Sequence, residues 1–339
     1  MYRIKIAQIG TSEYSHGCEV FERLKNDTKN FELVGYAFPE KEDEKFFDFI
    51  SEFDNVPRMT VEEILNNPEI EAVSIETEEI YLAKYALMAA KANKHIHLEK
   101  PGAMSLNDFE ELISIMKKTG KVLHMGYMYR YNPYISKLIE TIDRGELGEI
   151  ISVEAQMSCI YDDKQRKWLN TFPNGGMLFF LGCHLIDFVY RIQGTPKNVI
   201  PFIKNTRIGN VSAPDYGLVV MEYDRGVSFI KTTAVERGGF LRRQLIVTGS
   251  KKTVQIQPLE VHSGEGYPLM YVEKQECDSE IWGEEGKRAR SNVFHRYDSM
   301  MSSFAAYVCG EIKNPYTLEY ELELYKLITS CCNINQNGK

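Results

Sequence analysis

The sequence predicts an α/β protein with two domains: a doubly wound parallel sheet over residues 1–124, and an α+β domain with a large open, mostly antiparallel sheet over residues 125–339. Three observations support this prediction. The chain has 339 residues, whereas one domain usually holds about 100–200. Strand-like and helix-like segments alternate five times in the first part, which is typical of a parallel sheet with helices on both faces. After Gly148, strand-like segments follow one another instead.

Short apolar runs predict the strands of the first domain, and amphipathic spacing predicts its helices. The expected strands are 4–9, 31–37, 72–76, 95–98 and 122–125. The expected helices are 17–26, 61–66, 81–92 and 106–119, and Ser105 could cap the last of them.

The second domain has a different pattern, in which turn signals such as Asp224–Gly226 and Gly249–Lys251 favour antiparallel hairpins. The expected strands are 150–160, 199–208, 216–224, 227–235, 243–249 and 253–257. The expected helices are 132–143, 177–193 and a final one over 317–333, which could pack back on the first domain.

Composition excludes several classes of protein. The net charge is −8 with mixed signs and no basic stripe, which argues against a nucleic-acid partner. No apolar run approaches the roughly 18–20 residues of a membrane span. The chain enters a strand pattern at once, without a signal-peptide core, and its scattered cysteines suit a reducing cytoplasm, where we expect the protein. The seven cysteines are scattered without a C-x-x-C pair, so we expect neither disulfides nor a metal site.

The first strand leads into the turn GTSEYS, residues 10–15. A dinucleotide-binding fold prefers G-x-G-x-x-G there, because the glycines make the turn tight and admit the pyrophosphate. Gly10 is present, whereas Ser12 and Ser15 replace the other two glycines, so a plain strand–helix turn is an equal alternative. Phe38 stands where an acid would hold the ribose; it could stack on adenine or simply pack in the core. The acidic run Glu40–Glu44 is expected to be a solvated surface.

Several motifs together reveal a family resemblance. The chain reads HIHLEKP over 95–101, GYMYRYNP over 126–133 and IDRGELGEI over 142–150, and a Gly175-Gly176 pair precedes GCHLID over 182–187. In this order they resemble the glucose–fructose oxidoreductase, inositol dehydrogenase and MocA (Gfo/Idh/MocA) family. The resemblance implies an N-terminal Rossmann domain, bound NAD or NADP, a sugar, cyclitol or related substrate, and a homodimer or homotetramer joined through the C-terminal sheet.

The resemblance also implies a site. Lys100 follows a strand, where a doubly wound fold presents its ligands, and a buried lysine can take part in proton transfer. His184 lies on an apolar helix, where a packed histidine is more common than a catalyst, but the matching histidine of the family is an acid/base. Asp187 could orient His184 or stabilise the helix. The residues expected to bind the cofactor are Gly10, Thr11, Ser12, Phe38, Thr77, Glu99 and Lys100, and those expected to bind the substrate are Tyr127, Arg130, Asn132, Tyr161, Trp168, Phe180 and His184.

The chain departs from the family pattern in its acidic residues. Phe180 replaces a carboxylate of the catalytic set, and Glu78-Glu79 replace the P-N of a T-P-N step that begins at Thr77. With Glu13, these glutamates would repel a pyrophosphate, by roughly 3 kcal/mol for a pair of like charges about 6 Å apart. The primary hypothesis is therefore an NAD(P)-dependent oxidoreductase in which Lys100 and His184 assist proton transfer. The alternatives are a catalytically degenerate binding module, and an atypical lyase or epimerase with tightly held NAD.

Overall fold

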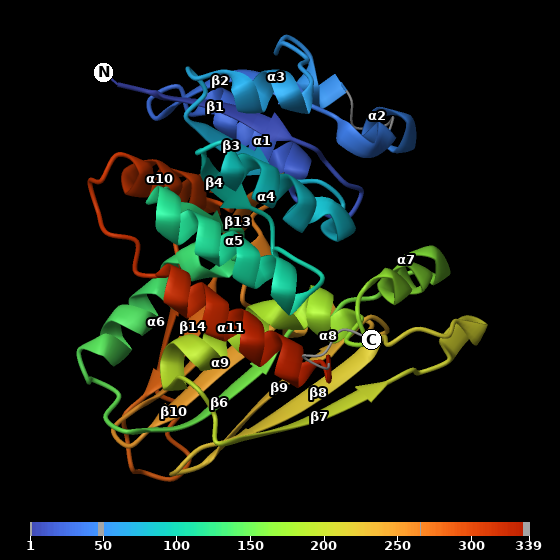
Figure 1. The fold of residues 1–339 in the computed structure, drawn as a ribbon. Coiled ribbons are helices and arrows are strands. Elements are labelled where there is room, and N and C mark those ends of the chain that lie inside the picture. Colours follow the sequence, from blue (N-terminus) through green and yellow to red (C-terminus); the bar gives the residue numbers. More distant parts are fainter. Residues whose placement is uncertain (1, 47–50, 265, 335–339) are drawn as a thin grey trace. The chain divides into compact units, whose positions relative to one another are not determined.

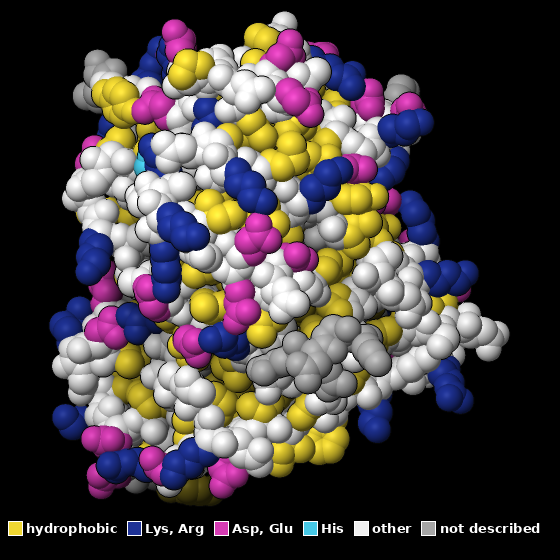
Figure 2. Space-filling view, in the orientation of Figure 1, with side chains coloured by type: hydrophobic (Ala, Val, Ile, Leu, Met, Phe, Trp, Pro, Cys, Tyr) yellow, Lys and Arg dark blue, Asp and Glu magenta, His cyan; other side chains and the backbone are white. Residues whose placement is uncertain are grey.

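A computed structural model describes residues 2–46, 51–264 and 266–334 (Figure 1). The chain forms two compact units. We call Met1–Met128 with Tyr297–Tyr325 the N-terminal unit, and Tyr129–Arg296 with Lys326–Lys339 the C-terminal unit. No helix of the described residues is both long and apolar enough to cross a bilayer. Figure 2 shows basic and acidic side chains interspersed over the visible face.

The N-terminal unit is built on a parallel sheet of order β2-β1-β3-β4-β5, which confirms the doubly wound prediction. Its strands are β1 (Ile4–Ile9), β2 (Phe31–Ala37), β3 (Ala72–Ile75), β4 (His95–Leu98) and β5 (Leu123–Met125). Nearly all their side chains are buried, as expected of a parallel sheet covered on both faces. A single parallel bridge between Tyr36 and Arg58 extends the sheet beyond β2. With this short segment the sheet has the 3-2-1-4-5-6 order of a dinucleotide-binding fold.

The helices of the N-terminal unit include some that were predicted from the sequence and others that were not. They are α1 (Gly17–Asn26), α2 (Glu42–Lys45), α3 (Val61–Asn66), α4 (Leu82–Lys91), α5 (Leu106–Thr119) and α10 (Asp298–Val308), with short 3-10 helices η1 (Pro39–Lys41) and η3 (Glu79–Tyr81). The predicted cap is confirmed, because the Ser105 hydroxyl accepts a hydrogen bond from the Asp108 N–H at 3.2 Å. Thr60 and Glu63 form a capping box before α3.

Two returning segments complete the core of the N-terminal unit. Phe304 of α10 stacks on His124 of β5, with 5.2 Å between ring centroids. Tyr325, in α11 (Leu318–Cys331), stacks on Phe109 of α5 at 4.4 Å and donates its hydroxyl to the Ala103 carbonyl at 2.8 Å. The sequence did not predict α10, although its buried residues Met300, Met301, Phe304 and Tyr307 lie at helical spacing.

The C-terminal unit contains an eight-stranded sheet of order β15-β14-β11-β10-β6-β9-β8-β7. In Figure 1 its long strands β7, β8 and β9 run side by side. Of the strand pairs among the described residues, β6–β9 is parallel and the others of this sheet are antiparallel, which confirms a mostly antiparallel sheet. The strands are β6 (Ile150–Gln156), β7 (Asn198–Lys204), β8 (Tyr216–Glu222), β9 (Val227–Thr233), β10 (Gln244–Gly249), β11 (Thr253–Ile256), β14 (Glu273–Cys277) and β15 (Lys287–Arg290).

The remaining elements of the C-terminal unit include a three-stranded sheet and several helices. The small sheet has the order β12-β13-β16, with β12 (Val261–His262), β13 (Leu269–Tyr271) and β16 (Phe294–His295). The helices are α6 (Pro133–Asp143), α7 (Asp163–Trp168), α8 (Met177–Phe180) and α9 (Gly182–Gln193), with η5 (Leu169–Thr171), η6 (Ile208–Asn210) and η7 (Gly239–Arg242); η4 (Met128–Tyr131) joins the two units.

Two sequence predictions need correction in the C-terminal unit. The helix expected over 177–193 is interrupted at Leu181, next to Gly182, and glycine disfavours a helix interior by roughly 1 kcal/mol relative to alanine. The strand expected over 150–160 ends at Gln156. Beyond that strand the chain still bonds to its neighbour, because the Cys159 N–H donates to the Thr233 carbonyl at 3.0 Å.

A buried ion pair fixes α9 to the chain before α6. Arg130 donates from Nε and Nη2 to the two carboxylate oxygens of Asp187, both at 2.9 Å, and both side chains are only 3% exposed. The Ser136 hydroxyl also donates to the Arg130 carbonyl at 2.8 Å. A bidentate pair of this geometry is among the stronger hydrogen-bonded contacts in proteins, and its loss leaves a buried charge unpaired.

We predict that Asp187→Asn lowers the free energy of unfolding by about 3–5 kcal/mol, because the Arg130 guanidinium loses its carboxylate inside the protein. Asp143→Asn is the matched control, since Asp143 is 52% exposed and pairs with Arg191 of the same helix α9 at 2.6 Å. The control should cost less than about 1 kcal/mol. Denaturant unfolding of both variants measures the difference. Equal costs would show that the buried pair contributes no more than an exposed one.

Candidate functional site

The turn after β1 brings Gly10 against Thr77, at the ends of β1 and β3. Gly10 has φ +85°, and a Cβ there would lie 2.8 Å from the backbone N and Cα of Thr77. Any side chain is therefore excluded both by the backbone conformation and by the neighbouring strand. The sequence prediction places both residues in the cofactor site, and the structure brings them together at the carboxyl edge of the sheet, where such folds hold their ligands.

The backbone donors of this turn are bonded to side chains of the chain itself. The Thr11 N–H donates to Glu42 Oε2 at 3.3 Å. The Ser12 N–H donates to the Ser15 hydroxyl at 3.2 Å, and the Ser15 N–H donates to the Ser12 hydroxyl at 3.0 Å. The two serines that replace glycines thus fold the turn on itself, a role that G-x-G-x-x-G matching alone does not reveal.

Four carboxyl groups of the N-terminal unit are buried near the ends of its strands. They are Glu42, Glu76, Glu79 and Glu99, each no more than 3% exposed. Burial raises the pKa of Glu42 to about 9 and that of Glu79 to about 7. Burial, and then the neighbouring Glu99 charge, raise the pKa of Glu76, and burial also raises the pKa of Glu99. Burial favours the neutral form of these carboxyls, but at Glu99 the neighbouring Lys100 ammonium acts in the opposite direction and lowers the pKa.

The position of these acids corrects two expectations. The run Glu40–Glu44 is not a uniformly solvated surface, because Glu42 is fully buried within it. Of the three glutamates expected near the pocket, Glu79 is buried, Glu78 is half-buried and bonded to Lys45 at 2.6 Å, and Glu13 is exposed. Sequence reasoning missed Glu42 because it lies among charged residues, and missed Glu76 because it ends an apolar strand.

Lys100 directly follows β4 and lies beside Glu99. Its ammonium nitrogen is 3.5 Å from the Glu99 carboxylate, and the two side chains are 3% and 2% exposed. Gly126 makes room for this pair, since a Cβ there would lie 2.6 Å from Glu99 Oε2. The predicted cofactor residues Glu99 and Lys100 therefore form a buried, oppositely charged pair at the carboxyl end of β4.

A row of buried polar side chains crosses the sheet next to this pair. Glu76 Oε1 lies 3.4 Å from His97 Nε2, and His97 Nδ1 lies 2.7 Å from His124 Nδ1, so one imidazole donates to the other. Burial lowers the pKa of His97 to about 3, which keeps its ring neutral. The row links β3, β4 and β5. Sequence analysis did not single out these histidines, because they lie within apolar strands.

Phe38, at the end of β2, belongs to an aromatic cluster and also borders a cavity. Its ring centroid is 4.9 Å from that of Tyr36 and 4.7 Å from that of Phe53. The Arg58 guanidinium lies 5.6 Å from the Phe38 centroid, and both line a cavity of about 380 Å³. The two sequence interpretations of Phe38, core packing and ring contact with a ligand, are therefore compatible.

In the C-terminal unit, His184 packs against Tyr129. The His184 side chain is buried in α9, and its ring meets the edge of Tyr129 at 5.2 Å between centroids. The Tyr129 hydroxyl donates to Glu260 Oε1 at 2.5 Å and accepts from Arg243 at 2.9 Å. Arg296 donates to the same carboxylate at 2.5 and 2.8 Å. His184 thus adjoins a buried cluster of two guanidiniums and one carboxylate.

The other predicted substrate residues fall into separate groups. Asn132 caps α6 and donates to the Leu259 carbonyl at 2.9 Å, and Arg130 pairs with Asp187, so both have structural partners. Trp168 and Phe180 pack edge to face at 4.8 Å. Tyr161 is half-buried, whereas Tyr127 is buried in the N-terminal unit.

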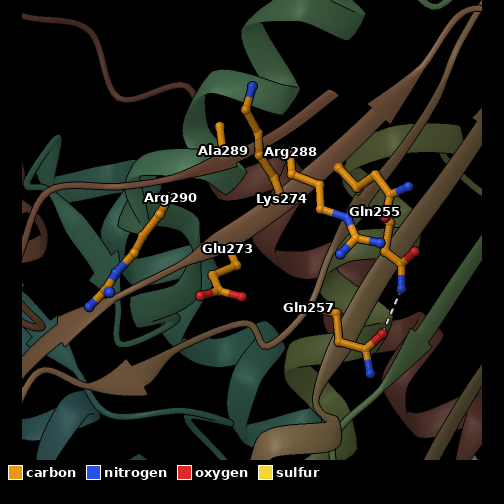
Figure 3. A pocket seen from close by; sticks show the side chains of 8 residues that line it. Gln255, Gln257, Glu273, Lys274, Arg288, Ala289 and Arg290 are labelled. Carbon is orange, nitrogen blue, oxygen red and sulfur yellow. Dashed lines mark hydrogen bonds between the residues drawn. The ribbon is translucent and has the colours of Figure 1, made fainter. Parts of the chain in front are cut away.

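A further cavity lies within the C-terminal unit. It measures about 470 Å³ and lies over β11, β14 and β15, where Figure 3 shows Arg288, Gln255 and Gln257. Gln255 donates to Gln257 at 2.5 Å within it. None of the predicted site residues lines this cavity. Over the described ranges, no group of three or more His, Cys, Asp or Glu side chains could hold a metal ion.

Comparison with known proteins gives matches to both halves of the chain. Residues 4–127 match a family model described as oxidoreductase family, NAD-binding Rossmann fold. Residues 135–255 match the Gfo/Idh/MocA C-terminal domain. Glucose-6-phosphate 3-dehydrogenase of Bacillus subtilis is 31% identical over 172 residues, which cover 48% of this chain and 47% of that protein. The NADP-dependent scyllo-inositol 2-dehydrogenase of the same organism is 25% identical over 166 residues, covering 49% and 46%.

The chain spans about half the length of these curated relatives. Solved structures match over nearly the whole chain, but at low identity. The aldose-aldose oxidoreductase of Caulobacter crescentus, complexed with glycerol, has a TM-score of 0.77 and 18% identity, covering 100% of this chain and 99% of its own. A 3-ketoreductase of Actinomadura kijaniata with NADP and TDP-benzene has a TM-score of 0.76 and 16% identity, covering 97% of each. The fold and the two family matches, in order along the sequence, show that the chain belongs to the Gfo/Idh/MocA family of oxidoreductases with an NAD-binding Rossmann fold.

Proposed function

We propose that the chain is an NAD(P)-dependent dehydrogenase or reductase that acts on a sugar, a cyclitol or a related polyol or keto compound. The observation that carries this proposal is the buried Glu99–Lys100 pair at the carboxyl end of β4, in a chain of this family. Relatives named glucose-6-phosphate 3-dehydrogenase and scyllo-inositol 2-dehydrogenase support the substrate class.

The turn after β1 fits a dinucleotide in most respects. Gly10 leaves no side chain between the turn and β3, and the Thr11 and Ser12 N–H groups precede α1, where a pyrophosphate would accept hydrogen bonds. Phe38 and Arg58 border the cavity at the end of β2, where the adenosine would lie. Two contacts oppose binding: the Glu42 carboxyl accepts the Thr11 N–H, and the Ser15 hydroxyl accepts the Ser12 N–H. When bound, the nicotinamide supplies the hydride acceptor or donor.

Lys100 and His184 are the groups proposed to move the proton that accompanies hydride transfer. Oxidation of an alcohol requires removal of its hydroxyl proton, and reduction of a ketone requires its delivery. The Lys100 ammonium is held by Glu99 at 3.5 Å, so it can hydrogen-bond a substrate oxygen while its charge stays compensated. His184 is a buried imidazole backed by Tyr129, whose hydroxyl is itself fixed by Glu260 and Arg243. We propose a soluble homodimer or homotetramer as the assembly.

A specific observation also supports a second candidate, a degenerate family member that binds a small molecule without turnover. Phe180 stands where the family carries a carboxylate, and it packs on Trp168 at 4.8 Å and on Phe172 at 5.4 Å. No acid can act from that position. In this candidate, Lys100 would still bind a ligand oxygen, but no hydride would be transferred.

We predict that the wild type binds NADH or NADPH and oxidises or reduces at least one member of a panel of polyols and keto sugars. Lys100→Ala should lower kcat/KM by about 10²–10⁴, because it removes a proton-transferring group. Lys91→Ala is the control, since Lys91 is 61% exposed and pairs with Glu111 at 3.0 Å. Fluorescence titration and absorbance at the nicotinamide band provide the two readouts.

Two results would count against the proposal. Absence of binding of either cofactor at millimolar concentration would exclude a dehydrogenase. Binding without any turnover across the panel, together with a Lys100→Ala variant that still binds cofactor, would favour the degenerate binding module.

A further inference from the structure

Glu42 occupies an unusual position for a charged side chain. It is the first residue of α2, its side chain has no exposed surface, and its Oε2 lies 3.3 Å from the Thr11 nitrogen. Its other oxygen, Oε1, is buried and has no hydrogen-bond partner in the described part of the chain. A buried polar atom without a partner costs free energy, so this arrangement calls for a reason beyond stability.

The donor that Glu42 takes belongs to the turn that binds the pyrophosphate in dinucleotide-binding folds. Thr11 follows Gly10 directly, and its N–H lies in the turn that leads into α1. In dinucleotide-binding folds the pyrophosphate accepts hydrogen bonds from backbone N–H groups of this turn. A carboxyl oxygen accepts the same hydrogen bond as a phosphate oxygen does. Glu42 and a bound pyrophosphate therefore compete for the Thr11 N–H.

We propose that Glu42 is an internal occupant of the pyrophosphate position, and that NAD(P) binds only after residues 39–45 move and withdraw it. This inference rests on the proposed function, because it requires that the chain bind a dinucleotide. It assigns to Glu42 the role of a residue that sets cofactor affinity rather than one that contacts the reacting atoms.

The backbone before Glu42 is held in a costly conformation. Glu40 has φ 58° and Lys41 has φ 59°, so two consecutive residues other than glycine lie in the left-handed region. Side chains with a Cβ adopt that region at a cost in free energy, and such residues cluster at ligand clamps and switch segments. Release of the segment would relieve this strain, which offsets part of the cost of moving Glu42.

Outer contacts hold the segment in place, and each of its ion pairs has one exposed partner. Asp43 accepts from Arg58 at 2.7 Å, and Lys45 donates to Glu78 at 2.6 Å; the Arg58 and Lys45 side chains are 54% and 40% exposed. Glu40 pairs with Lys84, which is 54% exposed, and accepts from the Tyr85 hydroxyl at 2.7 Å. Exposed ion pairs contribute little stability. The segment is therefore held only weakly at the protein surface, whereas its buried side chain, Glu42, contacts the turn after β1 at Thr11.

The protonation of Glu42 gives the displacement a measurable signature. Burial raises its pKa to about 9, and Glu78 and Glu40 act in the same direction, while the Thr11 N–H and Lys45 act in the opposite direction. The carboxyl is thus neutral at pH 7 in the free protein. In water its pKa returns to about 4.3. Withdrawal therefore releases a proton, and cofactor affinity should rise with pH between about 5 and 9.

The test is isothermal titration calorimetry of the full chain with NADPH and with NADH, at pH 7, in two buffers of different ionisation enthalpy. The variants are Glu42→Ala and Glu42→Gln. The matched control is Glu44→Ala, because Glu44 belongs to the same short helix but its side chain is 68% exposed and pairs with Lys41 at 3.7 Å. If the open segment is about one-tenth populated, Glu42→Ala should lower Kd about tenfold.

Proton release on cofactor binding distinguishes competition between Glu42 and the cofactor from a purely structural role of Glu42. The wild type and Glu44→Ala should release about one more proton per cofactor bound than Glu42→Ala or Glu42→Gln, since only Glu42 passes from a buried neutral form to a solvated anion. Glu79, Glu76 and Glu99 are present in every variant, so the difference between variants isolates Glu42. Glu42→Gln keeps the size of the side chain and serves if Glu42→Ala fails to fold.

Three outcomes would overturn the inference. A Kd for Glu42→Ala equal to that of Glu44→Ala, with equal proton release, would show that Glu42 does not compete with the cofactor. Weaker binding by Glu42→Ala would mean that the carboxyl binds the cofactor itself. If the wild type binds the cofactor in either of these two outcomes, the proposed function is not contradicted. Absence of binding by the wild type and by Glu42→Ala alike would overturn both.

Discussion

The parallel sheet of the N-terminal unit is buried on both faces, and this constraint determines where its polar groups can lie. A strand packed between two helical layers tolerates few charges in its interior, so charged residues gather where the strands end. Glu76 comes directly after β3, Glu99 and Lys100 come directly after β4, and Thr11 follows the glycine after β1. Because parallel strands end at one edge, the topology alone collects acids, a lysine and backbone donors in one place.

The polar row inside the sheet is the exception that supports this argument. His97 and His124 lie within strands. Their Nδ1 atoms share a hydrogen bond at 2.7 Å, while Glu76 lies 3.4 Å from His97 Nε2, which has no hydrogen-bond partner in the described part of the chain. Phe304 of α10 then stacks on His124 and covers the row. A buried polar row of this kind is tolerated when its members bond to one another, and it makes their relative positions specific. It also joins the buried carboxyl of Glu76 to two further strands.

The sequence alone was sufficient for most of the N-terminal unit, because local signals and tertiary packing agree there. The predicted bounds of β1, β2, β4, α1, α3 and α5 coincide with those of the structure. The misses have physical causes. The segment that forms the bridge at Arg58 is too short to show the alternating hydrophobic pattern of a strand. The short strands β12, β13 and β16 pair only in their tertiary context.

The site was less predictable than the fold, since burial of a polar residue leaves no local pattern. Glu42 has the same neighbours in sequence as a solvated acid, and only the left-handed backbone of Glu40 and Lys41 turns it inward. Ser12 and Ser15 read as missing glycines, whereas their hydroxyls accept the N–H groups of the turn. The resemblance to a family pointed to these turns, but the contacts that their residues make depend on tertiary placement.

The glutamates around the turn after β1 suggest a strongly anionic pocket that should repel a pyrophosphate. The burial of several of these glutamates changes that expectation. A carboxyl that cannot reach water is easier to keep protonated than to ionise, which is why the pKa of Glu42 rises to about 9 and that of Glu79 to about 7. Glu99 faces the Lys100 ammonium, so its charge is compensated when present. The pocket therefore carries far less negative charge at neutral pH than its composition implies. An acidic sequence is compatible with an anionic cofactor provided that its acids are buried, and the obstacle that remains is the place that Glu42 occupies rather than its charge.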